Sequence, residues 1–517
     1  MTDGPWAALR RQAELAAIGP SLQQIAVPDP PPLSPAQLRL WQLDQLHPGQ
    51  RTQNLHLTYR LRGPLEVSRL AAALAAVWAR HAGLRTTIRT AHGRPYQHLH
   101  PPDGWQVDHA DGAGEAGARQ RAVDLVAAPY ALDRDQLFRA GLYRIADADH
   151  LLVIGAHHIV FDAWSRDVLH HEVSALYADP ATSLLPLRVD YPRYATWQNA
   201  RIADTDVDTP LRDWWTRYLA GAPRPASLGG TSTAEEGPRP RRRHVSSVAA
   251  STVADLRAAA RDAGGSLFGA LFAGFAALVA GRSGERDAVI LSPAAGRTDP
   301  ALHDLIGYFV NLQPLRADLR DSPDAVTLLR RCAEGASGAA AHQGLPGPAL
   351  AALYGRAPRT APLLFGLQNT GGTPLALPDV VVSDAHLECG EADFEVYLNL
   401  EPGPGGSLRC IVDYDGATHT GRAISDLVED YRALLVQLAA GDLRSPAATV
   451  AGPIPQPTSQ PGPATAAAPT ASTLSYLRGQ VGLLVGTADV DVEASLLQLG
   501  MDSLKLIELA GRIERQL

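Results

Sequence analysis

Residues 151–165 read LLVIGAHHIVFDAWS, and the fold class that we expect follows from them. The apolar run at 151–155 is typical of a strand buried within a sheet. His157 and His158 follow that run, and Asp162 comes four residues after His158. From Asp162 onward the apolar residues recur at helical spacing, so a helix is predicted to begin there. A strand that leads into a helix through a polar turn is the repeating unit of an α/β fold.

The same alternation of strands and helices extends over most of the chain. The sequence predicts strands at 53–61, 288–291 and 363–367, and helices at 65–82, 266–280 and 423–439. We therefore expect two α/β lobes, at residues 31–205 and 206–444. Residues 1–30 are interpreted as an N-terminal extension with a helix at 6–17, and the Gly-, Pro- and Arg-rich residues 227–243 as an exposed loop.

The composition changes abruptly near the C-terminus. Residues 445–472 contain almost no charged or large apolar side chains, so they cannot bury enough surface to offset chain entropy. Their many Pro and Ala residues indicate a semi-extended linker. Residues 473–517 are patterned again, which predicts a small helical segment on a tether.

Overall composition excludes several classes of protein. The 517 residues carry a net charge of −8, which argues against a nucleic-acid partner. The most apolar stretch, 267–280, is shorter than the roughly 20 residues that a membrane span needs, so it is predicted to be a buried helix. The three cysteines show neither disulfide nor zinc-site spacing, and a reducing cytoplasm fits them.

The paired histidines allow three interpretations. They can be core residues with satisfied hydrogen bonds, ligands of a metal together with Asp162, or a site in which one imidazole handles protons. The metal interpretation is the weakest, because adjacent residues of an extended segment point in opposite directions. A second pair, His170 and His171, lies inside the predicted helix and is expected to face solvent.

Residues 499–504, LGMDSL, carry the other dense signal. Asp502 and Ser503 form a good helix N-terminus, and this alone accounts for the pair. A serine at a helix start on a tethered segment can also receive a phosphodiester, which the helix N-terminus would stabilise. We find no pattern for ATP binding or adenylate formation, so the chain is not expected to activate its own substrate.

These motifs together resemble one family. AHHIVFDAWS is similar to the HHxxxDG motif of nonribosomal peptide synthetase condensation domains, and LGMDSL to the phosphopantetheine attachment site of carrier proteins. Further similar segments follow in the family's order: LSPAQLRLWQLDQL (33–46), RHAGLRTTI (80–88), YPRYATWQ (191–198), IGYFVNLQPLR (306–316), AHQGLPGP (341–348) and RAPRTAPLLFGLQNT (356–370).

The resemblance implies two chloramphenicol-acetyltransferase-like lobes in a V, with a tunnel between them for the arms of donor and acceptor carrier proteins. It implies that His158 is the histidine tied to catalysis and that His157 is partly structural. It further implies that Asp162 pairs with Arg316 to hold the loop, and that Ser165 and Trp164 support the site. The expected product is an amide, formed when a carrier-bound acyl thioester reacts with a carrier-bound amine.

The resemblance also implies 4′-phosphopantetheine on Ser503 and on the partner carriers, a stand-alone adenylation enzyme in trans, and no metal, nucleic-acid or membrane partner. The carrier segment ends about one helix after Ser503, so it is interpreted as partial.

Some alternatives stay open at this stage. Ala163 replaces the motif glycine, which would cost roughly 1 kcal/mol if the backbone there has positive φ. Residues 341–348 lack the family's usual acidic and aromatic residues. An ester-forming reaction with a hydroxyl acceptor, a noncatalytic docking or scaffolding protein, and a coenzyme A-dependent acyltransferase are the other hypotheses. Whether His158 is a base or positions the amine is also open.

Overall fold

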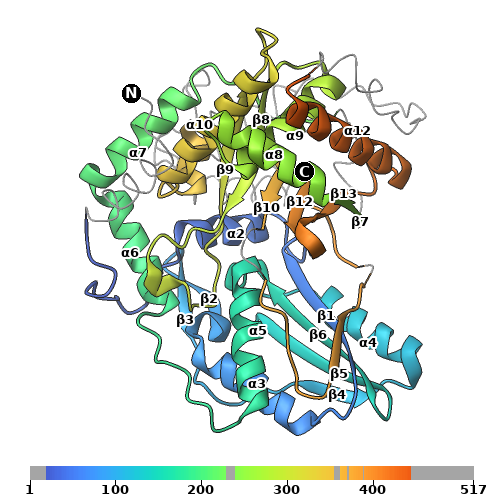
Figure 1. The fold of residues 1–517 in the computed structure, drawn as a ribbon. Coiled ribbons are helices and arrows are strands. Elements are labelled where there is room, and N and C mark those ends of the chain that lie inside the picture. The colour runs from blue at the N-terminus through green and yellow to red at the C-terminus, as the bar shows by residue number, and fades with distance from the viewer. Residues whose placement is uncertain (1–18, 229–238, 354–360, 369–371, 388, 444–517) are drawn as a thin grey trace, which may run out of the picture.

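The computed structural model describes residues 19–228, 239–353, 361–368, 372–387 and 389–443. Within these residues the chain forms two lobes, each built on its own β-sheet (Figure 1). The α/β class predicted from the strand and helix pattern is confirmed. The helix predicted at 6–17, the linker at 445–472 and the carrier segment at 473–517 lie outside the described residues.

The first lobe contains a five-stranded sheet in the order β11-β1-β6-β5-β4, in which only the β4–β5 pair is parallel. The strands are β1 (Asn54–Arg62), β4 (Asp108–Asp111), β5 (Phe138–Ala146), β6 (Asp149–His157) and β11 (Val381–Asp384). β6 lies between two neighbours and is buried along its length, as its apolar run predicts. A separate hairpin joins β2 (Thr86–Ala91) to β3 (Arg94–Leu99).

The helices of the first half of the described chain are α2 (Pro35–Leu46), α3 (Val67–Arg80), α4 (Gly114–Ala127), α5 (Ala163–Ala178), α6 (Tyr191–Ala203) and α7 (Thr205–Tyr218), with short 3₁₀ turns η1 (Ala82–Arg85) and η2 (His158–Val160). Of these, α3, α4 and α5 lie against this sheet or its core, and the others lead toward the second lobe. α3 and α5 pack on the apolar core of the first lobe. α7 instead contributes Trp215 to the core of the second lobe.

The second lobe contains a six-stranded mixed sheet in the order β7-β13-β12-β10-β8-β9. Its strands are β7 (Arg241–Val248), β8 (Asp287–Ala294), β9 (Asn311–Asp318), β10 (Ala361–Leu367), β12 (Phe394–Pro402) and β13 (Leu408–Asp415). Its helices are α8 (Ala250–Asp262), α9 (Leu267–Ser283), α10 (Ala325–Ala341), α11 (Gly347–Leu353) and α12 (Gly421–Ala440), with 3₁₀ turns η3 (Pro300–Leu302) and η4 (Pro404–Gly406). β7 begins inside the segment that was predicted to be a loop, which is a correction.

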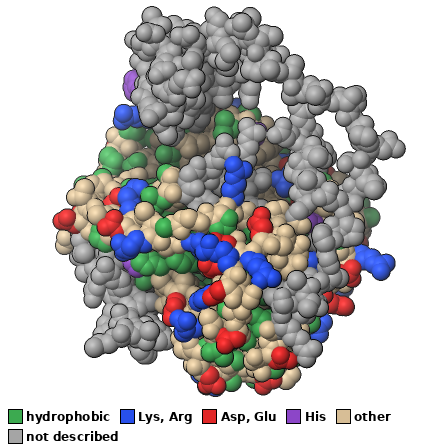
Figure 2. Space-filling model, turned by 90° about the horizontal axis from the view of Figure 1, so that it is seen from above, with side chains coloured by type: hydrophobic (Ala, Val, Ile, Leu, Met, Phe, Trp, Pro, Cys, Tyr) green, Lys and Arg blue, Asp and Glu red, His purple; other side chains and the backbone are tan. Residues whose placement is uncertain are grey.

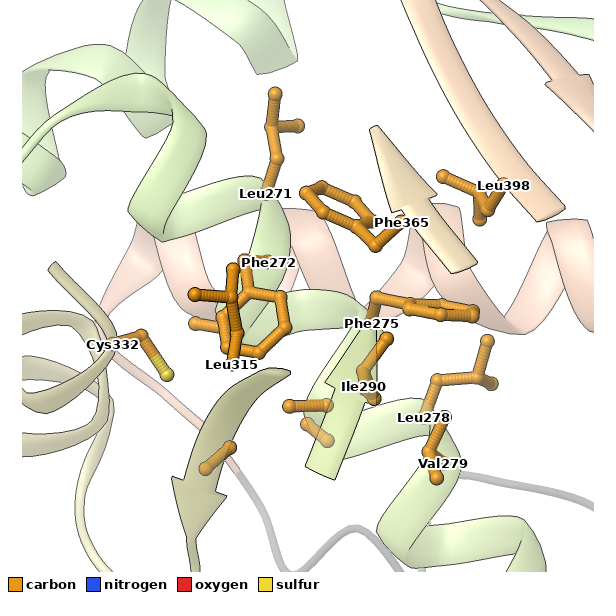
Figure 3. Close-up of a cluster of buried hydrophobic side chains, with 14 of the residues drawn as sticks. Leu271, Phe272, Phe275, Leu278, Val279, Ile290, Leu315, Cys332, Phe365 and Leu398 are labelled. Atoms are coloured by element: carbon orange, nitrogen blue, oxygen red, sulfur yellow. The ribbon is translucent and has the colours of Figure 1, made fainter. Parts of the chain in front are cut away.

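Helix α9 is the centre of the second lobe. Figure 3 shows Phe272 and Phe275 from this helix facing Phe365 of β10, with ring centroids 5.6 and 5.8 Å from that ring. On another side, Gly274 lies so close to α12 that an added Cβ would be 2.6 Å from Leu435. A helix packed on several sides must be apolar all round, which confirms the prediction of a buried helix here.

The later half of the chain returns to the first lobe. β11 pairs antiparallel with β1, with Leu61 opposite Val382, and Leu375 and Leu377 enter the first-lobe core. The sequence did not predict this crossing, because four residues of strand between Gly- and Pro-rich segments carry little periodicity. The crossing ties the two lobes together through a shared sheet.

Among the described residues no single helix has both the length and the apolar character to cross a membrane, although the bent pair α8 and α9, which turns through 103°, has them jointly. Figure 2 shows acidic and arginine side chains interspersed over the face seen from above. The described part of that face therefore presents no large area of one charge.

Candidate active site

The site is built where β6 ends. His157 is the last residue of β6 and is buried, with 3% of its surface exposed. Its Nδ1 accepts a hydrogen bond from the backbone N–H of Ile159 at 3.1 Å, and the Tyr130 ring meets its edge. Burial, and next the neighbouring His158, lower the pKa of His157 to about 3. His157 is therefore a neutral residue that shapes the turn.

His158 has a different environment. Its side chain is only partly buried, and its backbone N–H donates to the carbonyl of Gln53, the residue before β1. Its Nδ1 lies 2.7 Å from the Phe161 carbonyl oxygen. Because a carbonyl can only accept, Nδ1 carries a proton, and in the neutral ring Nε2 then carries the lone pair. Nε2 has no hydrogen-bond partner in the described part of the chain, so it can accept a proton from a substrate.

Asp162 holds the turn that follows. It is the N-cap of α5, and its Oδ1 accepts from the Ser165 N–H at 2.8 Å. Its Oδ2 accepts from the Phe309 N–H at 3.1 Å, and only 1% of the residue is exposed. The carboxylate therefore links the start of α5 to a segment nearly 150 positions away in the sequence.

The partner of this carboxylate is Arg297, and the predicted pairing with Arg316 is wrong. Arg297 Nη2 lies 3.1 Å from Asp162 Oδ1, and both side chains are 1% exposed. Burial lowers the pKa of Arg297, and the charge of Asp162 opposes that shift. Arg316 lies on β9 and forms a two-pronged ion pair with Asp287 of β8, at 2.9 and 2.7 Å. Strand β9 points the Arg316 side chain toward its neighbouring strand, whereas the loop after β8 brings Arg297 to α5.

Ser165 and Trp164 both contact the distant loop, as support of the site requires. The Ser165 hydroxyl lies 2.7 Å from Asp162 Oδ1 and 3.0 Å from the Gly307 carbonyl, and it accepts from the Gly307 N–H. Trp164 donates from Nε1 to the His303 carbonyl at 2.9 Å. Whether these contacts matter for catalysis stays a prediction.

Residues 306–309, which we call the interlobe segment, are held by side chains instead of by a sheet. The Ile306 N–H donates to His81 Nδ1 at 3.2 Å, and His81 Nε2 lies 2.8 Å from Glu172. Tyr191 donates from its hydroxyl to the Tyr308 carbonyl. The segment presents the Tyr308 ring to the ring of His158, with centroids 4.8 Å apart.

Sequence reasoning did not single out His81, Tyr191, Arg297 or Tyr308 individually. His81, Tyr191 and Tyr308 lie inside three of the quoted motifs, so the motifs were a signal that could have found them. Arg297 lies outside all of them, and an arginine followed by Thr and Asp in a loop is typical of an exposed position, so the sequence carried no signal for it.

Two further sequence predictions need correction. His170 is buried, not solvent-facing: its Nδ1 donates to the Thr373 carbonyl and its Nε2 lies 2.7 Å from the Tyr59 hydroxyl. His171 is exposed as predicted. Ala163 is the first residue of α5 and is not among the described non-glycine residues with positive φ, so the expected backbone cost does not arise.

Within the described residues, no group of three or more His, Cys, Asp or Glu side chains is arranged to hold a metal ion. In that part of the chain the site therefore consists of a partly exposed imidazole supported by buried hydrogen bonds and one buried ion pair.

Known protein families match most of this chain. Residues 28–450 match the condensation domain family. The chain belongs to that family. Residues 475–517 match the phosphopantetheine attachment site, so a carrier-type segment follows the condensation domain, as predicted. Ser503 falls inside this match but outside the described residues.

Curated relatives are much longer than this chain. The malpinin synthetase of Mortierella alpina is 31% identical over 434 residues, which cover 80% of this chain and 6% of the relative. The isonitrile lipopeptide synthase of Mycobacterium tuberculosis is 32% identical over 452 residues, covering 80% of this chain and 17% of the relative. The condensation domain thus matches a small part of each of these relatives.

Solved structures share the fold. The X-domain from teicoplanin biosynthesis has a TM-score of 0.72 at 24% identity and covers 83% of this chain and 99% of that one. The first condensation domain of the calcium-dependent antibiotic synthetase, in complex with substrate analogue 2a, has a TM-score of 0.68 at 23% identity, over 81% and 98% of the two chains. At these identities the likeness establishes the fold alone.

Proposed function

We propose that this chain joins a carrier-bound acyl thioester to the amine of a carrier-bound acceptor, forming an amide bond in nonribosomal peptide synthesis. The observation that carries the proposal is the state of His158. Its Nδ1–H is held by the Phe161 carbonyl and its Nε2 lone pair is left without a partner among the described residues. Membership of the condensation domain family supports the reaction class.

The proposed reaction needs one base, which takes a proton from the amine and returns it to the leaving sulfur. The acceptor nitrogen attacks the thioester carbonyl, the new C–N bond forms, and the amine proton passes to His158 Nε2. The C–S bond then breaks, and the departing thiolate takes up the proton. The Phe161 carbonyl would stabilise the imidazolium by accepting from Nδ1–H. Because both reactants arrive on carriers, their proximity supplies a further part of the acceleration.

The partners belong to the same proposal. Donor and acceptor would be carried by other synthetase modules, and an adenylation enzyme acting in trans would activate their acyl groups. Ser503 is the proposed attachment residue for 4′-phosphopantetheine, because it occupies the serine position of LGMDSL within the matched segment. We further place the protein in the cytoplasm, where free thiols such as the buried Cys332 and Cys410 are stable.

Reconstitution with loaded carriers tests the reaction. The full-length chain is mixed with an acyl-loaded donor carrier and an aminoacyl-loaded acceptor carrier, and the acceptor is followed by mass spectrometry. His158→Ala should abolish product formation while leaving the fold intact. His171→Ala, at an exposed position of α5, should keep the wild-type product formation. Full activity of His158→Ala would reject the catalytic role.

The same assay separates the alternatives. Product from a hydroxyacyl acceptor but not from an aminoacyl acceptor would show ester formation. Carrier binding by the wild-type chain without any product would favour a noncatalytic scaffold. For the attachment residue, the full-length chain is incubated with a phosphopantetheinyl transferase and coenzyme A. A mass gain that Ser503→Ala loses supports the assignment, and no gain in the wild type rejects it.

A further inference from the structure

We propose that Tyr308 is a second catalytic residue of this site, whose phenol hydroxyl donates a hydrogen bond to the thioester carbonyl oxygen as the acceptor amine attacks. The inference rests on the proposed function, because it assigns a group to that reaction. Four observations support the inference: the position of the Tyr308 ring, the absence of a hydrogen-bond partner for its hydroxyl among the described residues, the protonation state of the phenol, and the fixed backbone around it.

The position of Tyr308 is the first argument. Its ring centroid lies 4.8 Å from that of His158, and the two ring planes make an angle of 62°. The phenol thus borders the imidazole whose Nε2 is proposed to take the proton. A reacting carbonyl must lie close to that nitrogen, since the nitrogen that attacks it gives its proton to Nε2.

The hydroxyl of Tyr308 forms no hydrogen bond with any described residue, and 6% of the residue is exposed. Tyr191, which packs against the same backbone segment, shows the usual arrangement: its hydroxyl donates to the Tyr308 carbonyl and lies 3.1 Å from Ser34 Oγ. The Tyr308 hydroxyl oxygen is not among the described buried side-chain atoms that lack a partner, so it borders accessible space. A bound carbonyl can take the place of water there.

The charge state of the phenol suits a donor. Burial raises the pKa of Tyr308 to about 12, and among the nearby charges Arg39 lowers it while Asp393 and Asp162 raise it. The hydroxyl therefore keeps its proton throughout the neutral range. A protonated phenol can stabilise negative charge that develops on a carbonyl oxygen, and it works best where water is excluded.

The backbone around Tyr308 is fixed from both sides. The Gly307 N–H donates to Ser165 Oγ, and the Phe309 N–H donates to Asp162 Oδ2. A Cβ on Gly307 would overlap the Tyr191 ring, so this backbone packs without space to shift. A donor that is held in place in this way needs little reorganisation during the reaction.

The proposed step conserves atoms and charge. As the C–N bond forms, the carbonyl π electrons move to oxygen, and the Tyr308 hydroxyl donates its hydrogen bond to that oxygen without losing its proton. The amine proton goes to His158 Nε2. When the carbonyl re-forms, the C–S bond breaks and the sulfur leaves as a thiol with the proton from His158.

Tyr308→Phe tests the assignment, because it keeps the ring against His158 and removes only the hydroxyl. Tyr194→Phe is the matched control: Tyr194 is 2% exposed, its hydroxyl also has no partner among the described residues, and its ring packs on Phe309 instead of His158. We expect Tyr308→Phe to lower kcat about 100-fold with KM and Tm nearly unchanged, as for the loss of one oxyanion donor. Tyr194→Phe should keep the wild-type kcat.

Equal kcat in the two variants would overturn the inference. It would leave the proposed function standing, since that function is rejected only if the wild-type chain makes no product from the same loaded carriers. A readout without turnover uses a donor arm with a ¹³C-labelled ketone in place of the thioester. The bound carbonyl signal should lie downfield in the wild type relative to Tyr308→Phe, and identical shifts would also overturn the inference.

Discussion

Replacing Asp162 with alanine leaves the guanidinium of Arg297 buried without its carboxylate, and we expect a large loss of stability. Both side chains are 1% exposed, and removing one partner of such a pair costs about 3–5 kcal/mol. The substitution also removes the α5 N-cap, where Oδ1 accepts from the Ser165 N–H, for about 1 kcal/mol more. The two costs together, about 4–6 kcal/mol, are comparable with the lower end of the free energy of unfolding of native proteins, about 5–15 kcal/mol.

A double-mutant cycle measures the pair itself. The free energy of unfolding in urea is compared for the wild type, Asp162→Asn, Arg297→Met and the double variant. Asparagine is used because its amide oxygen can still accept from the Ser165 N–H. We expect a coupling energy of about 2–3 kcal/mol between positions 162 and 297, at the upper end for residues in direct contact.

A second cycle provides the control that can refute the argument. Arg316 pairs with Asp287, whose side chain is 10% exposed, so Arg316→Met and Asp162→Asn should be additive within about 0.5 kcal/mol. Coupling between Asp162 and Arg316 larger than that between Asp162 and Arg297 would show that the ion-pair assignment is wrong.

Three further predictions concern the surroundings of the site. Burial lowers the pKa of His157 from 6.5 to about 3, so below about pH 6.5 the unfolded chain binds a proton that the native state does not. The contribution of this residue to stability is therefore full above that pH, and the free energy of unfolding should fall by about 1.4 kcal/mol per pH unit down to about pH 3. Urea titrations of a His157→Asn variant should show a weaker dependence of the free energy of unfolding on pH. Glu172→Gln removes the carboxylate that holds His81 in its tautomer, so kcat should fall several-fold while KM stays constant, and an unchanged kcat would mean that the pair only supports folding. Gly307→Ala would place a methyl group in overlap with the Tyr191 ring, so calorimetry should show about 1–3 kcal/mol of destabilisation, and a neutral effect would show that the ring can move away.

Local features of the fold followed from the sequence because they depend on neighbouring residues. The apolar run before His157 is a buried strand, as the local pattern predicted. The helix predicted to begin near Asp162 does so, with Asp162 as its N-cap. α9 is buried as its composition required. These features need only periodicity and the hydrogen-bonding capacity of single side chains.

Long-range contacts did not follow in the same way. The sequence could predict that the Asp162 carboxylate needs a cation. It could not predict which arginine reaches that carboxylate, because this depends on how the loop after β8 passes α5. Arg316 was chosen for its place in a motif, and its strand instead directs it to Asp287. His170 was misplaced for a related reason: β1 and the returning segment cover its side of α5.

The interlobe segment explains why motifs far apart in the sequence act on one place. Its backbone groups bond to His81, Ser165, Asp162 and Tyr191, which come from three different motifs of the first half of the chain. These side chains replace the sheet partners that residues 306–309 lack, so each backbone group they satisfy also fixes the ring of Tyr308 beside His158. A substitution in any one of them should therefore alter the reaction centre through this backbone, even though only His158 and Tyr308 are proposed to meet the substrate.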